Sequence, residues 1–277
     1  MKRGVATLRR FPHTGAMNLN IAIIHETDVL AKVSSPHEAW LVYQNEYRPG
    51  DAIAFSTDTE GFVVLRLEDF LAPTLVYAAK GTFTLPIPFG EKKICYPPLS
   101  FGGTVHYLSA REAEPWETEG TRDISTNPLD CHENTTIFPH ATANVETRGE
   151  SVFAARCAVD GVIANHSHGT WPYASWGINR DPNAALTLEF GRMVTIEEII
   201  LYLRADFPHD AWWKQAKVRM DEGEDILLHL EKSDKAQKFP IRPVTTRRMT
   251  LHDLVKADDP SPFPALAQIR VLGREAR

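Results

Sequence analysis

The sequence predicts an all-β protein built from two β-sandwich domains in tandem. Helical periodicity is almost absent from its 277 residues, and short runs with strand character recur between turn signals. Strands of this length and spacing are typical of β-sandwiches. Residues 112–134 are polar and irregular, which is typical of a domain boundary. We therefore expect a flexible arm over residues 1–17, a first sandwich over 18–111, a linker over 112–137 and a second sandwich over 138–277.

The first block contains runs of strand-forming residues separated by turns such as Arg48-Pro49-Gly50-Asp51. Its prolines must lie at strand ends, edges or loops, because proline cannot donate a hydrogen bond to a neighbouring strand. The expected strands include Asn18–His25, Ala39–Tyr43, Asp51–Ser56, Gly61–Leu67, Thr74–Tyr77, Thr82–Ile87 and Thr104–Ala110.

The second block follows the same pattern. Apolar and polar residues alternate in Leu186–Phe190, as expected of a strand with one buried face. Only Glu150–Val159 has a helical pattern, and it is short. The expected strands are Ala185–Phe190, Thr195–Arg204, Gln215–Asp221, Asp225–Leu230, Gln237–Pro240, Arg247–Asp253 and Ala267–Leu272.

Composition limits the classes of partner. The net charge of −6 provides no electrostatic footprint for nucleic acid. No run of about 18 apolar residues predicts a membrane helix, and Met1–Met17 lacks the apolar run of a secretory signal. Cys95, Cys131 and Cys157 share no CxxC spacing, which favours reduced thiols and a cytoplasmic location. Cys157 lies in an apolar phrase, so we expect it to be buried.

Two runs, Asn165–Asn179 and Arg204–Trp213, concentrate unusual residues. They hold four of the six tryptophans and three histidines. Glycine and proline interrupt both runs, so we expect loops with a strand pattern between them. Loops that carry Trp, His, Arg and Asp together are typical of ligand sites. Function is therefore predicted to lie in these two loops.

Several short sequence segments of the second block occur in an order that is known from another group of proteins. They are Ala158–Gly161, Trp176, Ala185–Gly191, Val194–Ile200, Ala216–Gly223 and Ala265–Gly273. In this order and spacing, residues 138–273 resemble the galactose-binding-like (discoidin, coagulation factor type C) jelly roll. The loop phrases also resemble those of uncharacterised two-domain bacterial proteins described as carbohydrate-binding. The resemblance implies a jelly-roll fold and a sugar-binding or surface-binding module, with ligand contacts on loops at one end.

The resemblance also implies a structural calcium near the turn at Asp160-Gly161. It nominates Asp160, Asn165 and Gln268 as ligands, although Gln268 stands where an acid is common. The alternative is that Asp160-Gly161 is simply a tight turn. A zinc site is a further alternative, because zinc accepts the ligand types of His166, His168, His209 and Asp210, but their spacing matches no specific zinc pattern.

A sugar presents an apolar ring face and a rim of hydroxyls, so its site needs aromatic platforms and polar side chains. We expect Trp176 and one of Trp212 and Trp213 in the core. Arg204 has a fork suited to the carboxylate of a uronate, or it pairs with Asp206 instead. The predicted ligand contacts are His168, Trp171, Tyr173, Asn179, Arg204, Asp206, His209, Asp210 and Trp212.

Two other functions compete with carbohydrate binding. A glycoside hydrolase could use Glu146 and Asp210 as acid and base, and a uronate lyase could use His209 as a base beside Arg204. Against an enzyme, the sequence has no nucleophile signature, and Glu146 could instead join Arg148 and Glu150 in ion pairs between the domains. A protein-interaction module would use the same aromatic and arginine-rich loops. Carbohydrate binding is the leading prediction.

Overall fold

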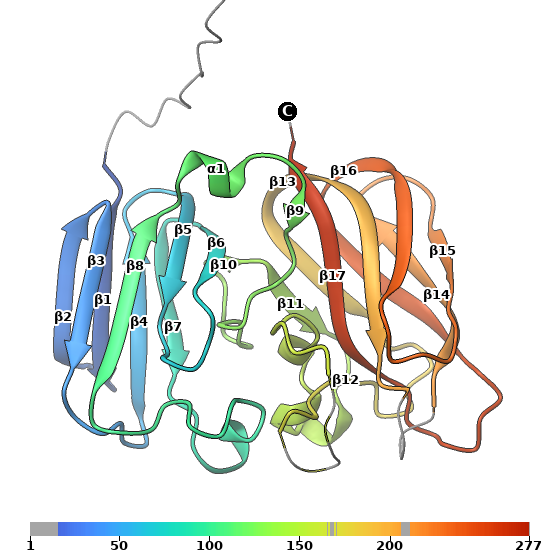
Figure 1. Cartoon of the computed structure of the whole chain (residues 1–277), viewed down its shortest axis with the longest axis horizontal. Coiled ribbons are helices and arrows are strands. Elements are labelled where there is room, and N and C mark those ends of the chain that lie inside the picture. The colour runs from blue at the N-terminus through green and yellow to red at the C-terminus, as the bar shows by residue number, and fades with distance from the viewer. Residues whose placement is uncertain (1–15, 165, 167–168, 170, 206–210, 277) are drawn as a thin grey trace, which may run out of the picture.

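The structure is a computed structural model that describes residues 16–164, 166, 169, 171–205 and 211–276. The all-β prediction is confirmed: two β-sandwiches lie side by side (Figure 1). In the first, a sheet with strand order β2-β1-β4-β7 faces a sheet with order β10-β6-β5-β8-β3. Its strands are β1 (Asn18–His25), β2 (Asp28–Pro36), β3 (Glu38–Tyr43), β4 (Asp51–Thr57), β5 (Gly61–Arg66), β6 (Thr74–Ala78), β7 (Gly81–Pro86), β8 (His106–Glu112) and β10 (Ile137–Phe138).

Alternating side chains form the first core. Along β1, Leu19, Ile21 and Ile23 are fully buried, while their neighbours remain partly exposed. Phe55 of β4 and Phe83 of β7 pack into the same cluster. The sequence analysis missed β2, which pairs with β1 at the edge of its sheet. None of its residues is buried, so it lacks the apolar alternation that reveals a strand.

The second sandwich contains two long strands where the sequence predicted four short ones. Ala185–Phe190 and Thr195–Arg204 are one strand, β13, whose register shifts between Glu189 and Val194. Gly191 lies in this bulge with φ 70°, a conformation that glycine accepts readily. The strands are β9 (Arg122–Asp123), β11 (His140–Ala143), β12 (Trp176–Gly177), β13 (Leu186–Leu203), β14 (Trp213–Met220), β15 (Ile226–His229), β16 (Gln237–Lys256) and β17 (Ala265–Glu275).

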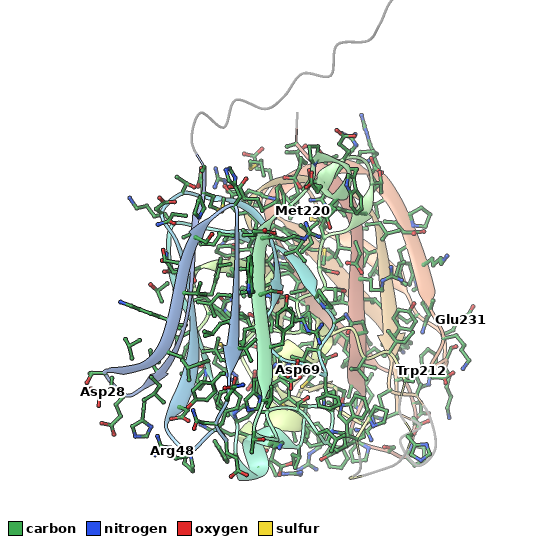
Figure 2. All side chains as sticks on the ribbon, turned by 60° about the vertical axis from the view of Figure 1, so that its left-hand side comes forward. Asp28, Arg48, Asp69, Trp212, Met220 and Glu231 are labelled. Carbon is green, nitrogen blue, oxygen red and sulfur yellow. The ribbon has the colours of Figure 1, made fainter. Side chains whose placement is uncertain are left out.

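These strands follow the order β12-β17-β13-β16-β14-β15, with β11 beside β13 and β9 beside β17. Trp213 begins β14 and Met220 ends it, so Trp212 and Met220 mark opposite ends of the sandwich (Figure 2). The helical prediction for Glu150–Val159 is only partly met, because this segment forms two 3-10 turns, η3 (Ser151–Phe153) and η4 (Ala155–Ala158). The other helical elements are α1 (Pro115–Thr118), η1 (Gly90–Lys93) and η2 (Thr147–Gly149). No helix in the described part of the chain is long and apolar enough to cross a membrane.

The polar segment predicted as a linker pairs and packs with the rest of the structure. Its β9 pairs with β17, and Asp130 is fully buried. Asp130 Oδ1 accepts hydrogen bonds from Asn134 Nδ2 and His140 Nδ1, both at 2.8 Å, and its Oδ2 accepts one from the Ala141 amide. Irregular backbone needs such partners when it is buried. The polar composition of this segment therefore supports a buried hydrogen-bond network, and the domain limits stay a prediction.

Arg122 and Arg192 of the second sandwich contact Phe62 of the first. Phe62, on β5, lies beneath the guanidinium groups of Arg122 and Arg192, whose Cζ atoms are 5.2 and 4.6 Å from the ring centroid. Both arginines also bind Glu275 of β17, at 2.6 and 2.8 Å. Burial alone would raise the pKa of Glu275, but hydrogen bonds from these two arginines outweigh it and lower the pKa. The contact therefore joins an aromatic face of one sandwich to a charge network of the other.

A second junction surrounds Arg156, which is buried in η4. Its Nε donates to the Asp130 carbonyl at 2.9 Å, and its Nη2 donates to the Pro128 carbonyl at 3.0 Å. The guanidinium lies 4.3 Å from the ring centroid of Tyr96, and Nη1 lies 3.4 Å from Cys95 Sγ. Arg156 therefore connects the polar segment to the β7–β8 loop of the first sandwich.

Candidate functional site

The structure describes about half of the predicted ligand contacts. Trp171, Tyr173, Asn179, Arg204 and Trp212 are described. The remaining predicted contacts, His168, Asp206, His209 and Asp210, lie outside the described residues, and so does Asn165 of the proposed calcium set.

The core predictions for the tryptophans are confirmed. Trp176 is fully buried, and its Nε1 donates to the Val145 carbonyl at 3.0 Å. Trp213 is 1% exposed, with its ring centroid 6.4 Å from that of Trp176. Trp212 is half-buried and packs against the same core. Trp213 is the first residue of β14, whereas Trp212 lies just before the strand.

Tyr173 and Arg204 are more buried than residues that form an aromatic platform and a polar rim for a sugar. They are 6% and 2% exposed, and the Arg204 Cζ is 5.7 Å from the Tyr173 ring centroid. Burial raises the pKa of Tyr173, while the charge of Arg204 opposes the rise. Neither residue lines the two cavities described below. Asn179 is exposed, and its backbone N–H donates to Thr147 Oγ1 at 2.9 Å. As ligand contacts, all three stay predictions.

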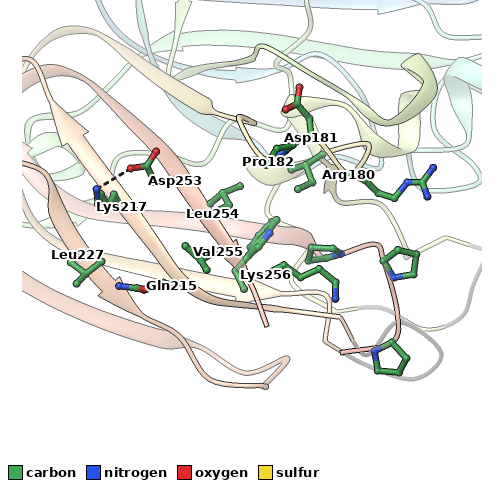
Figure 3. A pocket seen from close by; sticks show the side chains of 15 residues that line it. Arg180, Asp181, Pro182, Gln215, Lys217, Leu227, Asp253, Leu254, Val255 and Lys256 are labelled. Carbon is green, nitrogen blue, oxygen red and sulfur yellow. Dashed lines mark hydrogen bonds and ion pairs between the residues drawn. The ribbon is translucent and has the colours of Figure 1, made fainter. Parts of the chain in front are cut away.

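The larger of two cavities, here named the end cleft, has a volume of about 840 Å³ and is lined by Trp213, the first residue of β14. Figure 3 shows the side chains that line it. It lies between the loop after β12, strands β14, β15 and β16, and the loop before β17. Its lining residues are Ile178, Arg180, Asp181, Pro182, Trp213, Gln215, Lys217, Leu227, Asp253, Leu254, Val255, Lys256, Pro260, Pro262 and Pro264.

Two backbone hydrogen bonds connect the end cleft to the second predicted loop. The Arg204 amide donates to the Ala265 carbonyl at 2.9 Å, and the Ala257 amide donates to the Trp212 carbonyl at 3.0 Å. Each bond joins one end of the Arg204–Trp213 loop to one end of the proline-rich loop before β17. Arg204 and Trp212, at the described ends of this predicted run, are therefore tied by their backbones to the segments that border the end cleft.

The floor of the end cleft is apolar but contains one polar atom. Ile178, Leu254 and Trp213 are buried there. The Trp213 Nε1 is buried and has no hydrogen-bond partner among the described residues. A buried N–H without an acceptor carries a desolvation penalty of about 1–3 kcal/mol. An acceptor oxygen on a bound molecule that reached this atom would remove that penalty.

The rim of the end cleft carries donors and charges. Arg180 is exposed, its Cζ lies 5.5 Å from the ring centroid of Phe263, and no hydrogen bond or ion pair holds it within the described part of the chain. Lys256 Nζ donates to the carbonyls of Ala257 and Asp259. Lys217 and Asp253 pair with each other at 2.9 Å, as Figure 3 shows. Arg180 is therefore the rim cation with the most unused donors.

The sequence analysis missed most of the end cleft, although two signals were present. The phrase Asp259-Pro-Ser-Pro-Phe-Pro264 places three prolines between two strands, and proline makes a loop stiff. Asn179 and Arg180 are consecutive residues with positive φ, 48° and 62°, directly before Asp181-Pro182. Such a turn is uncommon for residues other than glycine, and it directs Arg180 to the rim.

Two of the three residues nominated for calcium, Asp160 and Gln268, accept backbone hydrogen bonds. The Val162 amide donates to Asp160 Oδ1 at 2.8 Å, and the Gly161 amide donates to Gln268 Oε1 at 3.1 Å. Backbone N–H groups therefore point at Asp160 Oδ1 and Gln268 Oε1, the side-chain oxygens that would have to contact a calcium ion. Calcium stays a prediction of the resemblance, and these contacts support the tight-turn alternative.

Of the proposed zinc ligands only His166 is described, and it is exposed. Among the described residues, Asp225, His252 and Asp253 lie close enough together to share a metal ion. Both carboxylates are already paired, Asp225 with Arg219 and Asp253 with Lys217. The hydrogen bond from Arg219 lowers the pKa of Asp225 to about 2. The ion pairs of Asp225 and Asp253 therefore explain this arrangement of side chains without a metal ion.

A second cavity of about 400 Å³, here named the interdomain cavity, lies between the sandwiches. Trp171 is half-buried in its wall, and its Nε1 has no partner among the described residues. Burial raises the pKa of Asp160 to about 7, against the opposing charge of Arg156. The lining residues are Phe70, Leu71, Ala72, Pro73, Thr74, Cys95, Tyr96, Pro97, Thr126, Pro128, Arg156, Asp160, Gly161, Val162 and Trp171.

No protein-family model matches the chain, and no curated protein matches it in sequence. Among solved structures it is similar to a family 32 carbohydrate-binding module from C. perfringens NanJ in complex with galactose, at 15% identity and a TM-score of 0.40, over 55% of this chain and 98% of that one. It is also similar to a fucose-binding module from Streptococcus pneumoniae, at 13% identity and a TM-score of 0.40, over 56% and 96%. A chitosan-binding module from Paenibacillus sp. IK-5 gives 15% identity and a TM-score of 0.37, over 54% and 98%. All three likenesses have TM-scores of 0.40 or less and sequence identities of 15% or less.

Proposed function

We propose that this protein binds a carbohydrate in the end cleft of its second sandwich. The observation that carries the proposal is the lining of the end cleft, which combines buried apolar side chains and the indole of Trp213, whose Nε1 has no partner among the described residues, with a rim of charged and amide side chains. A sugar ring has the matching surface, because its C–H face is apolar and its hydroxyls accept and donate hydrogen bonds. A volume of about 840 Å³ lies within the range of small-molecule sites.

The rim indicates how such a ligand would be oriented. Ile178 and Leu254 would contact the apolar face of the ring, while Trp213 donates to one oxygen. Arg180 and Gln215 would bind hydroxyls from the sides. If the sugar is acidic, Arg180 replaces Arg204 as the group that meets the carboxylate, because Arg204 is 2% exposed and lines neither cavity.

The acids of the end cleft do not favour the enzyme alternative. A general acid needs a raised pKa. The hydrogen bond from Lys217 lowers the pKa of Asp253 instead. Asp181 Oδ1 accepts a hydrogen bond from the Asn183 amide at 2.8 Å, which is the role of a turn-forming aspartate. Binding without turnover is therefore the expected behaviour.

A glycan screen with matched variants tests the proposal. The wild type should bind one class of neutral or acidic sugar, and Arg180→Ala should weaken that binding about tenfold, since a hydrogen bond to a charged group contributes about 1.5–3 kcal/mol. Trp213→Phe keeps the ring in the core but removes the donor, so it should weaken binding by about threefold to tenfold. Arg242→Ala is the matched control, because Arg242 is an exposed arginine of β16 that does not line the end cleft.

Two results would overturn the proposal. One is that no glycan binds at millimolar concentration. The other is that a bound glycan is retained equally by Arg180→Ala, Trp213→Phe and the control. Incubating each bound glycan with the protein and analysing the products separates binding from hydrolysis or elimination.

A further inference from the structure

Two cysteines from different halves of the chain meet at the junction between the sandwiches. Cys95 lies between β7 and β8, and Cys157 lies in η4. They are 3% and 0% exposed, so the predicted burial of Cys157 is confirmed, and both side chains pack in the same hydrophobic cluster. The Cys157 thiol donates a hydrogen bond to the Ser151 carbonyl at 3.3 Å.

A fixed positive charge lies beside this pair. Arg156 Nη1 is 3.4 Å from Cys95 Sγ, and the carbonyls of Asp130 and Pro128 hold the guanidinium in place. The hydrogen bond from Cys157, followed by the charge of Arg156, lowers the pKa of Cys95 despite burial. The same hydrogen bond, together with burial, raises the pKa of Cys157. The position of Arg156 beside Cys95 Sγ therefore favours ionisation of Cys95 over ionisation of Cys157.

The interdomain cavity gives a small molecule access to Cys95. Cys95 and Arg156 line it, and so do Phe70 and Gly161, which are exposed, so the cavity opens to solvent. Its volume of about 400 Å³ is ample for a molecule the size of hydrogen peroxide. Cys131 provides an internal comparison. It does not line the cavity, and burial raises its pKa to about 12.

We propose that Cys95 is a peroxide-reactive thiol that forms a disulfide with Cys157 and so links the two sandwiches covalently. The Cys95 thiolate sulfur attacks one oxygen of hydrogen peroxide, the O–O bond breaks, and hydroxide leaves and takes up a proton to form water. The Cys157 sulfur then attacks the sulfenic sulfur of Cys95, the S–O bond breaks, and the Cys157 proton leaves with that oxygen as a second water. Two thiols and one peroxide thus give one disulfide and two waters. This inference is independent of the proposed sugar site.

Mass spectrometry of the whole chain after peroxide treatment tests the inference. The oxidised protein should lose the mass of two hydrogens, yield a non-reduced peptide that joins Cys95 to Cys157, and leave Cys131 open to alkylation. Cys95 should react with peroxide at least about tenfold faster than Cys131, because the thiolate is the reactive form. Its rate should also reach a plateau at a lower pH than that of an ordinary thiol.

Single-cysteine variants distinguish the two steps. Cys157→Ser should stop the reaction at a sulfenic acid on Cys95, which dimedone traps. Cys95→Ser should remove the fast phase, and Cys131→Ser should behave as the wild type. Equal rates at Cys95 and Cys131, or peroxide oxidation of Cys95 in the wild type without a link to Cys157, would overturn the inference. A wild-type thermal unfolding scan checks that the protein is folded during each reaction.

Discussion

Replacing Arg156 by methionine should lower the free energy of unfolding by about 3–5 kcal/mol, the usual loss when one partner of a buried charge contact is removed. The magnitude follows from what the side chain touches. Its donors reach the carbonyls of Asp130 and Pro128, and each buried carbonyl left without a donor costs about 1–3 kcal/mol. Its contact with the Tyr96 ring adds about 0.5–2 kcal/mol. Because methionine fills most of the volume of the arginine side chain, the lost polar contacts account for most of the change in the free energy of unfolding.

Urea unfolding followed by tryptophan fluorescence measures this loss. Arg148→Met is the matched control, since Arg148 is exposed, pairs with Glu150 alone among the described residues, at 2.6 Å, and lies over the Phe153 ring. An exposed pair of this kind contributes about 0–1 kcal/mol. If both variants shift the urea midpoint by the same amount, Arg156 does not support the junction and the reasoning from its buried contacts is refuted.

Three further predictions concern charge and metal. Asp160 has a pKa of about 7 in the folded chain and about 3.9 when unfolded, so its contribution to stability is fully present below about pH 4 and is lost as the pH rises toward 7. Asp160→Asn should therefore unfold at a higher temperature than the wild type at pH 8 and at a similar temperature near pH 4; a constant difference would contradict the assignment. Glu275 has a lowered pKa, so its contribution is present at neutral pH and is lost as the pH falls through the folded-state value. Glu275→Gln should accordingly lose about 1 kcal/mol at pH 7 and nothing in strong acid, as urea unfolding at the two pH values will show. Calcium at millimolar concentration should leave the melting temperature unchanged, because backbone donors face Asp160 and Gln268; a calcium-dependent rise that Gln268→Ala abolishes would restore the calcium site.

Much of the fold was predictable because most strands have one buried face. β1 was predicted with its observed limits, since Leu19, Ile21 and Ile23 alternate with less buried residues. β13 and β16 were divided because Gly191 and Pro240 look like strand ends, whereas a bulge at each place lets the strand continue. β2 was missed because an exposed edge strand has no apolar face to reveal it.

The site was harder to predict than the fold. Arg204 and Tyr173 were predicted as ligand contacts, whereas in the structure they are 2% and 6% exposed and lie against each other. The end cleft brings together Arg180, which follows β12, and Lys256, which ends β16, in one lining. Contacts between segments so far apart in sequence leave no local pattern.

The first hydrophobic core also contains side chains from the second block. Val152, Cys157 and Tyr173 pack into the same cluster as Leu19 and Phe55. A fragment that begins at residue 138 would expose them to water, and a fragment that ends there would have cavities in their place. The sandwiches should therefore melt together in a single calorimetric transition, and the second one should be insoluble when expressed alone. Sugar binding, where it occurs, would belong to an indivisible unit of the whole chain, not to a module that can be transferred to another protein.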